Sequence, residues 1–416
     1  MAPPPRPYGR RVAPRAAAVL TVALGGLIAA GSAAAAPAEP SVAPPLTGVH
    51  DDRAWQGEGP VPGADRMADI VDVGAELFQT DLLWRQVAPD PPVDPADPAD
   101  PAYDWTGIDR AVRAAAAVGL RIQLLIYRTP DWLDPSELGN HAPPAWELRG
   151  FATAVGRRYS GRYRPSPYAA PLPRVGRFVA WNEPNLHGYI TPQFRMAGQR
   201  LVSVAPRLYA TILRSIRDGL RAGMRLAGAR PPLVAGGATA PKGDRHPRTA
   251  RATHTPQRFI TELARFRPVM DAWAQHAYPL GQPRFAAPRR DGPMDAWNVT
   301  AVPGLLDRAG GPLRGLPVWI TETGVPTSTL PWYGYAWEGA EAGRVLSAMF
   351  RRASSARRIR EFVLYFLQDH PRWRTGLRDE AFRPKPTWFA ACRAFWEARG
   401  GLCAGPADPY RTLIAP

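Results

Sequence analysis

The segment GIDRAVRAAAAVGLRIQLLIY (107–127) carries the pattern that decides the fold of this chain. In its first part (107–119), apolar residues recur at three- and four-residue spacing, which is typical of an amphipathic helix. Its last part, RIQLLIY (121–127), is a short apolar run rich in β-forming residues and predicts a strand. Segments of both kinds alternate along the chain, so we expect a fold built from repeated strand–helix units.

Eight short runs are predicted as strands, which is the number in a (β/α)8 TIM barrel. They are TGVH (47–50), ELFQTDLLW (76–84), RIQLLIY (121–127), RFVAWN (177–182), PLVAGGA (232–238), DAWAQHAY (271–278), PVWITET (317–323) and EFVLYFL (361–367). Further helices are expected at 145–159, 207–223, 256–266, 341–353 and 388–398, and long loops at 89–104, 163–174, 239–256 and 280–294. A doubly wound sheet is the alternative, but no glycine-rich phosphate loop follows the first strand.

The composition agrees with one large globular domain. Of 416 residues, 45% are hydrophobic and 21% are charged, which excludes wholesale disorder and supplies a sizeable core. The 49 prolines and 38 glycines are spread along the chain, which excludes a collagen-like protein. One α/β barrel with long loops can account for a chain of this length.

The chain is strongly basic, with a formal net charge of +16, and lysine occurs only at Lys242 and Lys385. Such a charge is compatible with an acidic partner such as nucleic acid or an acidic glycan. No basic block is interleaved with aromatic residues, so we do not expect nucleic-acid binding.

Residues 1–35 have the features of an export signal. A basic stretch ends at Arg15, the apolar run AAAVLTVALGGLIAA (16–30) follows, and SAAAA (32–36) offers small residues for cleavage. The apolar run is shorter than the ~20 residues of a membrane-spanning helix, although an uncleaved anchor is the alternative. We therefore expect a secreted protein with no membrane contact after cleavage before Ala36, a linker at 36–45 and one catalytic domain at 46–416.

The chain has two cysteines, Cys392 and Cys403, eleven positions apart. In an exported protein such a pair is expected to form a disulfide, with two free thiols as the alternative. No HExxH or CxxC spacing is present, so we expect neither a metal site nor a cofactor.

Two glutamates stand where the fourth and seventh predicted strands end. Glu183 lies in WNEPN (181–185), and Glu322 lies in WITETG (319–324). Active sites of α/β barrels form at the carboxyl ends of the strands. Cleavage of a glycosidic bond requires two carboxyl groups, one to donate a proton and one to act as nucleophile or base. Either glutamate alone would fit a salt bridge at the barrel mouth, but the pair favours catalysis.

These motifs resemble those of the clan A glycoside hydrolases, the "4/7" superfamily of retaining (β/α)8 enzymes. WNEPN (181–185) and AQHAYP (274–279) are most similar to its cellulase-like and β-xylosidase/iduronidase-like families, and the resemblance covers roughly residues 46–400. The resemblance implies that Glu183 is the acid/base and Glu322 the nucleophile. It also implies that Asn182 binds the sugar 2-hydroxyl, that Tyr278 orients Glu322, and that His276 lines the same subsite. We also expect Trp181, beside the acid, to contact substrate.

The sequence departs from this family at two places. In FQTDLLW (78–84), Gln79 stands where many members have an arginine that supports the nucleophile, while Asp81 and Trp84 match the pattern. The last predicted strand continues as YFLQD (365–369) in place of the tryptophan common to many members, so a sugar platform is expected elsewhere.

The sequence therefore predicts a secreted retaining glycoside hydrolase that acts on a poly- or oligosaccharide, with a catalytically silent glycan-binding barrel as the alternative. Further residues are candidates for sugar contacts. They are His50 and Asp51, with loop capping as the alternative, Arg128, with a surface ion pair as the alternative, and Trp84, Trp132, Trp332 and Trp373, with core or loop packing as the alternative.

Overall fold

The computed structural model describes residues 43–53, 61–244, 249, 251–281, 292–329, 335–406 and 408–410. The predicted signal peptide and residues 36–42 of the predicted linker lie outside the described residues. Residues Val42–Pro416 form one compact unit. The division of the chain into leader, linker and catalytic domain stays a prediction.

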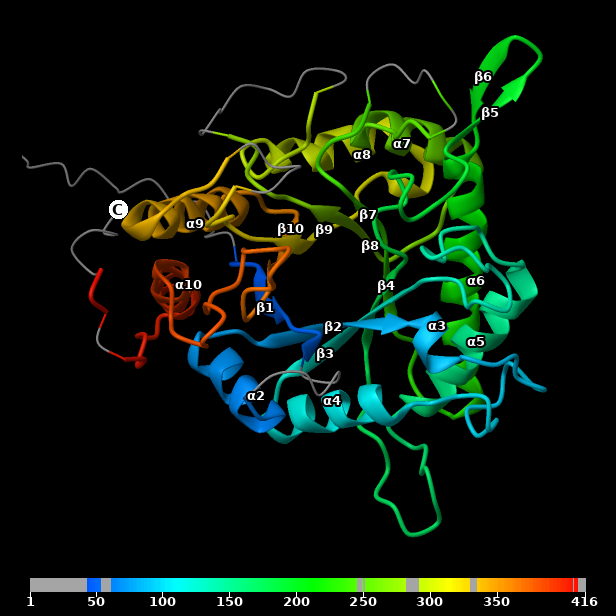
Figure 1. Ribbon diagram of the computed structural model, residues 1–416, viewed down its shortest axis with the longest axis horizontal. Helices are drawn as coiled ribbons and strands as arrows, with labels where there is room; N and C mark the ends of the chain where they lie inside the picture. The colour runs from blue at the N-terminus through cyan, green and yellow to red at the C-terminus, as the bar shows by residue number, and fades with distance from the viewer. Residues whose placement is uncertain are drawn as a thin grey trace, which may run out of the picture. The chain divides into compact units, whose positions relative to one another are not determined.

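The core is a closed barrel of parallel strands, which confirms the predicted (β/α)8 fold (Figure 1). Around the barrel the strands follow the order β1-β2-β3-β4-β7-β8-β9-β10 before closing on β1. Glu183 therefore follows the fourth barrel strand, and Glu322 lies in the seventh. The strands are β1 (Leu46–His50), β2 (Leu77–Leu83), β3 (Arg121–Tyr127), β4 (Arg177–Ala180), β7 (Leu233–Thr239), β8 (Ala272–His276), β9 (Val318–Thr323) and β10 (Ile359–Tyr365).

Helices surround the strands, as Figure 1 shows. Most were predicted because each buries one apolar face. The predicted ones are α4 (Thr106–Ala117), α5 (Ala145–Arg158), α6 (Ala205–Leu226), α7 (Pro256–Leu263), α9 (Gly339–Ser354) and α10 (Pro386–Glu397). Helices α5 and α6 pack closely through glycines, since a side chain on Gly156 or Gly223 would collide with the backbone of the other helix.

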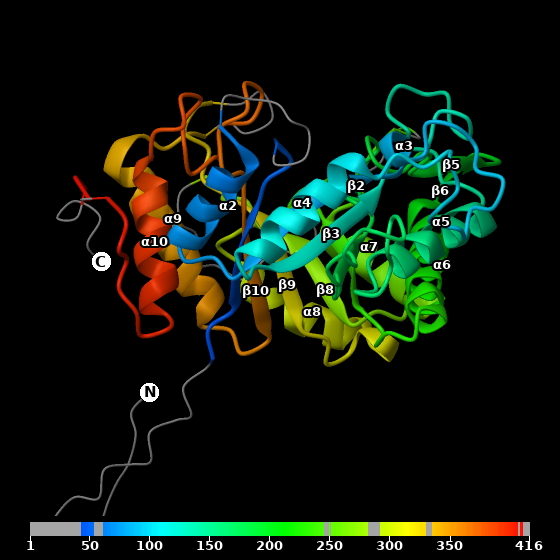
Figure 2. The same cartoon turned by 90° about the horizontal axis from the view of Figure 1, so that it is seen from below.

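Three helices and a hairpin were not predicted. The helix α2 (Gly63–Asp72) buries Arg66 and Asp69 beside its apolar residues, so its inner face lacks a hydrophobic pattern. The helix α8 (Val302–Ala309) has proline and glycine in its first turn, and α3 (Trp84–Val87) is a single turn. Strands β5 (Phe194–Ala197) and β6 (Arg200–Ser203) pair antiparallel and lie on the same side of the barrel as α3 (Figure 2); β5 is exposed except at Phe194, and β6 is mostly half-buried.

A chain of buried polar groups crosses the barrel interior. Arg177 lies over the Trp319 ring at 3.8 Å and pairs with Glu361, whose pKa is raised by burial. Gln123 donates to Glu361 Oε1 at 2.7 Å and to Gln79 Oε1 at 2.7 Å. Because buried polar groups are costly unless they are paired, this chain fixes the orientation of each side chain in it.

No helix in the described part of the chain is long and apolar enough to span a membrane.

Cys392 and Cys403 form a disulfide with their Cα atoms 5.4 Å apart, as expected from the sequence. It ties the last described segment to α10. Titration of the denatured, unreduced protein should therefore find no free thiol. Because the bond closes a short loop, replacing both cysteines with serine should lower the free energy of unfolding by about 2–3 kcal/mol. Two titratable thiols in the unreduced protein would contradict the bond.

Candidate active site

The backbone turns sharply where β4 ends, and this turn places Glu183 at the barrel mouth. Trp181 and Glu183 have positive φ angles of 69° and 35°, which non-glycine residues seldom adopt. Trp181 N–H donates to the Ile126 carbonyl of β3 at 2.9 Å, and Glu183 N–H donates to the Ala238 carbonyl of β7 at 3.0 Å. The neighbouring strands thus hold the strained turn from both sides.

Glu322 faces Glu183 from β9, and His276 of β8 lies between them. His276 Nδ1 is 2.9 Å from Glu183 Oε1 and 3.4 Å from Glu322 Oε2. Tyr278 Oη donates to Glu322 Oε1 at 2.7 Å. One carboxylate oxygen of each glutamate and a ring nitrogen of His276 all lie within 4.8 Å of one another.

The electrostatics of this cluster follow from burial and from the closeness of the charges. Burial raises the pKa of the Glu322 carboxyl, and repulsion by Glu183 raises it further, while His276 and the hydrogen bond from Tyr278 act in the opposite direction. Burial lowers the pKa of His276, but attraction to the two carboxylates outweighs burial and raises it above its ordinary value. A positively charged imidazole between two carboxyl groups is the arrangement that these shifts favour.

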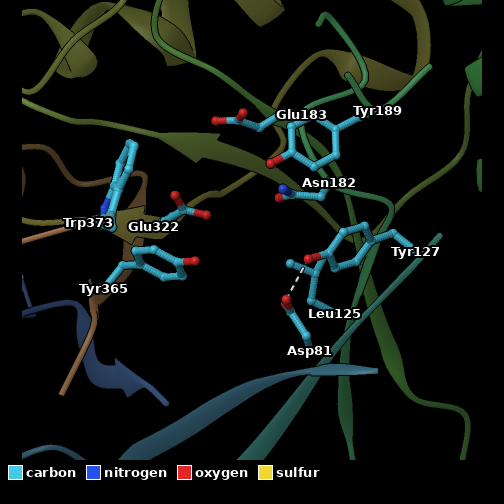
Figure 3. Close-up of a pocket in the computed structure, with 9 residues that line it drawn as sticks. All are labelled: Asp81, Leu125, Tyr127, Asn182, Glu183, Tyr189, Glu322, Tyr365 and Trp373. Atoms are coloured by element: carbon cyan, nitrogen blue, oxygen red, sulfur yellow. Dashed lines mark hydrogen bonds between the residues drawn. The ribbon is translucent and has the colours of Figure 1, made fainter. Parts of the chain in front are cut away.

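Both glutamates open into a pocket of about 140 Å³. Figure 3 shows their carboxyl groups on facing sides of it, with aromatic rings on two walls. The lining residues are Asp81, Leu125, Tyr127, Asn182, Glu183, Tyr189, Glu322, Tyr365 and Trp373.

Asp81, near the end of β2, supplies a third carboxyl group to the pocket. Tyr127 Oη donates to its Oδ2 (Figure 3). Burial raises the pKa of Asp81 to about 8, with repulsion by Asp52 and Glu322 in the same direction and with His50 and Tyr127 opposing it. This shift favours the protonated form of Asp81 at neutral pH.

Gln79 does not take over the support of Glu322 that an arginine gives in many clan A members. Its Nε2 donates to the Thr321 carbonyl at 2.9 Å and to His50 Nδ1 at 2.8 Å, and its Oε1 accepts from Gln123. Among the described residues, Tyr278 and His276 contact the Glu322 carboxyl group instead.

The charge on His50 is decided by these hydrogen bonds. Burial lowers its pKa, but nearby carboxylates, Asp52 foremost, raise it to about 9. A protonated ring would nevertheless point an N–H at the amide hydrogens of Gln79, whose orientation Gln123 and Thr321 fix. The directions of these bonds outweigh the pKa shift, so His50 is neutral here and donates from Nε2 to Asp52 Oδ1 at 2.8 Å.

The structure brings the predicted site residues together, but in two layers. Asn182, Glu183 and Glu322 line the pocket, and Asn182 Oδ1 is buried with no hydrogen-bond partner among the described residues. Behind them, His276 and Tyr278 contact the two carboxylates. Trp181 is 1% exposed, donates from its indole to the Tyr189 carbonyl at 2.8 Å, and does not line the pocket.

The other candidates divide in the same way. Trp373 lines the pocket and His50 belongs to the network beside it, whereas Asp51 pairs with Arg66. Three further candidates do not line the pocket. Trp84 is buried in the core, Trp132 donates to the Ala88 carbonyl, and Arg128 lies over the rings of Tyr127 and Tyr189. Trp332 lies outside the described residues.

Sequence reasoning missed three aromatic residues of the pocket. Tyr127 and Tyr365 end β3 and β10, so the rule that barrel sites form at strand ends would have found them. Tyr189 lies in the turn region after β4, where no sequence signal marks it.

Two clusters of histidine and acids have the closeness of metal ligands: His50, Asp52 and Asp81, and Glu183, His276 and Glu322. In the first, both ring nitrogens of His50 are engaged in hydrogen bonds. In the second, His276 Nδ1 is engaged by Glu183. In both clusters, these histidine nitrogens therefore already have hydrogen-bond partners within the protein.

No protein-family model and no curated protein matches the sequence. Solved structures share its fold. A family 39 glycoside hydrolase from Bacteroides cellulosilyticus WH2 has 18% identity and a TM-score of 0.58, over 84% of this chain and 63% of that one. A monomeric β-xylosidase from Caulobacter crescentus CB15 has 17% identity and a TM-score of 0.56, over 85% and 68%.

A family 5, subfamily 18 glycoside hydrolase from Streptomyces cattleya, in complex with GlcNAc, has 17% identity and a TM-score of 0.54, over 88% and 83%. The chain spans less than two thirds of the length of the Bacteroides enzyme. These likenesses are likenesses of fold, and they agree with the resemblance to clan A that the motifs indicate.

The raised pKa of Glu322 predicts that this side chain destabilises the folded protein. Above the raised pKa of the folded state, the buried carboxylate is charged, and the free energy of unfolding is lowered by the full cost of burying that charge. Below the ordinary value of 4.5, Glu322 is protonated in both the folded and the unfolded state, and this cost disappears. Glu322→Gln should therefore raise the melting temperature at pH 8 and leave it nearly unchanged near pH 4, as measured by calorimetry. A variant less stable than the parent at pH 8 would contradict this balance.

Proposed function

We propose that this protein is a glycoside hydrolase that cleaves O-glycosidic bonds of a poly- or oligosaccharide with retention of anomeric configuration. The observation that carries the proposal is the pair Glu183 and Glu322 on facing sides of one pocket, with carboxylate oxygens within 4.8 Å. Retaining enzymes hold their two carboxyl groups about 5–5.5 Å apart, whereas inverting enzymes leave about 6.5–9.5 Å for a water molecule. The separation here favours direct attack by one carboxylate on the sugar.

Glu322 is suited to the role of nucleophile. Tyr278 holds its Oε1 by a hydrogen bond of 2.7 Å, which fixes the carboxylate and leaves Oε2 to attack the anomeric carbon. Only the ionised form attacks. Because burial and Glu183 raise the pKa of Glu322, activity should fall on the acidic side at a pH above the ordinary value for a glutamate.

Glu183 is suited to the role of acid and base. His276 occupies its Oε1 at 2.9 Å, so Oε2 is the oxygen left to carry a proton to the leaving group. After glycosylation of Glu322, the same oxygen would remove a proton from the incoming water. Because the protein would release one proton and regain one, the cycle returns both glutamates to their starting states.

Asn182 and the aromatic walls supply the contacts that hold a sugar ring. The Asn182 side chain lies beside the two carboxylates in the pocket (Figure 3), and its oxygen is buried without a hydrogen-bond partner among the described residues. A hydrogen bond to the sugar 2-hydroxyl that strengthens in the transition state would satisfy it. The rings of Tyr127, Tyr189, Tyr365 and Trp373 would pack against the apolar C–H faces of the sugar.

We further propose that the protein is exported and acts outside the cell. The support is the signal-like segment 1–35, and the disulfide between Cys392 and Cys403 suits an oxidising compartment. Mass spectrometry of the exported protein should find its first residue near Ala36. Retention of residues 1–35 in the extracellular fraction would contradict cleavage.

The two glutamates should respond differently to substitution. Glu322→Gln should lose activity on every substrate, since no leaving group replaces a nucleophile. Glu183→Ala should still release dinitrophenolate, which leaves without a proton, and added azide should accelerate its second step. Hydrolysis of a panel of aryl β-glycosides gives both rates, and NMR of the first product should show retained configuration.

Tyr278→Phe is the matched control, because it removes one hydrogen bond from Glu322 and leaves both carboxyl groups in place. It should retain activity with an acidic limb shifted to higher pH. Inverted product, or a Glu183→Ala enzyme that responds to neither leaving group nor azide, would overturn the assignment. A folded wild type that binds sugars and hydrolyses none would support a silent glycan-binding barrel.

A further inference from the structure

Asp81 lines the pocket, and one of its carboxyl oxygens has no hydrogen-bond partner among the described residues. The residue is only 7% exposed, and its Oδ1 is buried with no hydrogen-bond partner in the described part of the protein. Leaving a buried polar atom without a hydrogen bond destabilises the protein, because the atom has lost its contact with water. Because Asp81 lines the pocket, a ligand bound there is a candidate for the partner that this oxygen lacks.

The surrounding bonds direct the nearby donors away from this oxygen. Tyr127 donates to Oδ2, on the other side of the carboxyl group. His50 Nε2 is 2.8 Å from Asp52 Oδ1 but 3.7 Å from Asp81 Oδ1, so its proton goes to Asp52. Gln79 fixes this proton by donating to the opposite ring nitrogen. The network therefore keeps Asp81 Oδ1 available.

The charge of the pocket restricts what can bind there. Asp81, Glu183 and Glu322 line it, and no lysine or arginine is among the lining residues that the structure describes. Within the part of the chain that the structure describes, His276 is the one cation in contact with the two glutamates, and it is buried behind them and shared between both. A sugar carboxylate would face the carboxylate of Glu322 and, above the pKa of Asp81, a second charged carboxylate, and repulsion between like charges is strong in a low-dielectric pocket.

We propose that Asp81 is the specificity-determining residue of this pocket: its Oδ1 binds one hydroxyl group of an uncharged sugar ring, and the pocket rejects sugars that carry a carboxylate. The inference rests on the proposed function in taking the pocket as the sugar site. It runs against the acidic glycan that the net charge of +16 permits, because that charge is not present where the sugar would bind.

The protonation of Asp81 agrees with this role. With Asp52, His50, Tyr127 and Glu322 as the ionisable groups that act on it, its pKa is raised to about 8. Below that pH the carboxyl group donates its proton to a hydroxyl oxygen, and above it the carboxylate accepts a hydroxyl proton. Either form pairs with a hydroxyl, but the ionised form repels a uronate more strongly.

A cycle of substrates and variants tests the assignment. The substrates are aryl glycosides of neutral sugars, their monodeoxy analogues and the matching uronic acids, and the enzymes are wild type, Asp81→Asn and Asp81→Ala. The wild type should lose at least tenfold in kcat/KM on one monodeoxy analogue, because the missing hydroxyl leaves Asp81 unpaired. In Asp81→Ala that loss should disappear for the same analogue and for no other.

The charge arm compares neutral and uronic acid substrates at pH 6 and pH 9. The wild-type preference for the neutral sugar should increase at pH 9, where Asp81 is ionised, whereas Asp81→Asn should keep at pH 9 the preference that the wild type shows at pH 6. Asp90→Asn is the matched control, since it removes a carboxylate from an exposed loop position and should leave both ratios unchanged.

Unchanged discrimination in folded Asp81→Asn and Asp81→Ala, or a wild type that prefers uronic acids, would overturn the proposal. If Asp81→Ala fails to fold, Asp81→Asn keeps the test, because it retains an oxygen for Tyr127. Binding of the free sugars, measured by NMR, tests the role of Asp81 separately from the proposal that the protein hydrolyses glycosides. A wild type that hydrolyses nothing, yet binds a neutral sugar more weakly once Asp81 is changed, would refute hydrolysis and support the role of Asp81.

Discussion

The constraint on which this site depends is the approach of two carboxyl groups to within 4.8 Å in a buried place. Charges so close repel each other, so the protein must supply compensation. His276 lies between them, and Tyr278 holds Glu322 from the side. The strained turn at Trp181 and Glu183 is a further cost, which the hydrogen bonds to β3 and β7 offset. A scaffold as rigid as a closed barrel can maintain such an arrangement.

The fold was predictable because its signal is spread over the chain. Short β-forming runs such as RIQLLIY (121–127) alternate with amphipathic helices, and each run matched a barrel strand to within a few residues. The failures have local causes. The helix α2 escaped prediction because Arg66 and Asp69 lie on its buried face, where they pair with Asp51 and Arg378. Pattern reasoning assumes an apolar inner face, and buried ion pairs violate that assumption.

Site residues that lie in short sequence motifs could be predicted, whereas contacts that depend on the register of neighbouring strands could not. WNEPN (181–185) and WITETG (319–324) pointed to both glutamates and to Asn182. No motif shows that Leu83 lies beside Tyr127, or that His50 lies beside Gln79 across β1 and β2; only the pairing of strands creates these contacts. Trp181 belongs to a motif but not to the pocket: the adjacent Asn182 lines the pocket, whereas the Trp181 ring is buried in the core.

The central claim is that Glu322 attacks the sugar, and trapping the covalent intermediate tests it most directly. Activated 2-deoxy-2-fluoro glycosides slow the second step of a retaining enzyme more than the first, so the glycosylated protein accumulates. Incubation with a panel of these reagents, followed by digestion and mass spectrometry, should show one added sugar on the peptide that contains Glu322 and none in Glu322→Gln. A sugar on the peptide that contains Glu183, or turnover of the ordinary glycosides without any trapped species, would contradict the account.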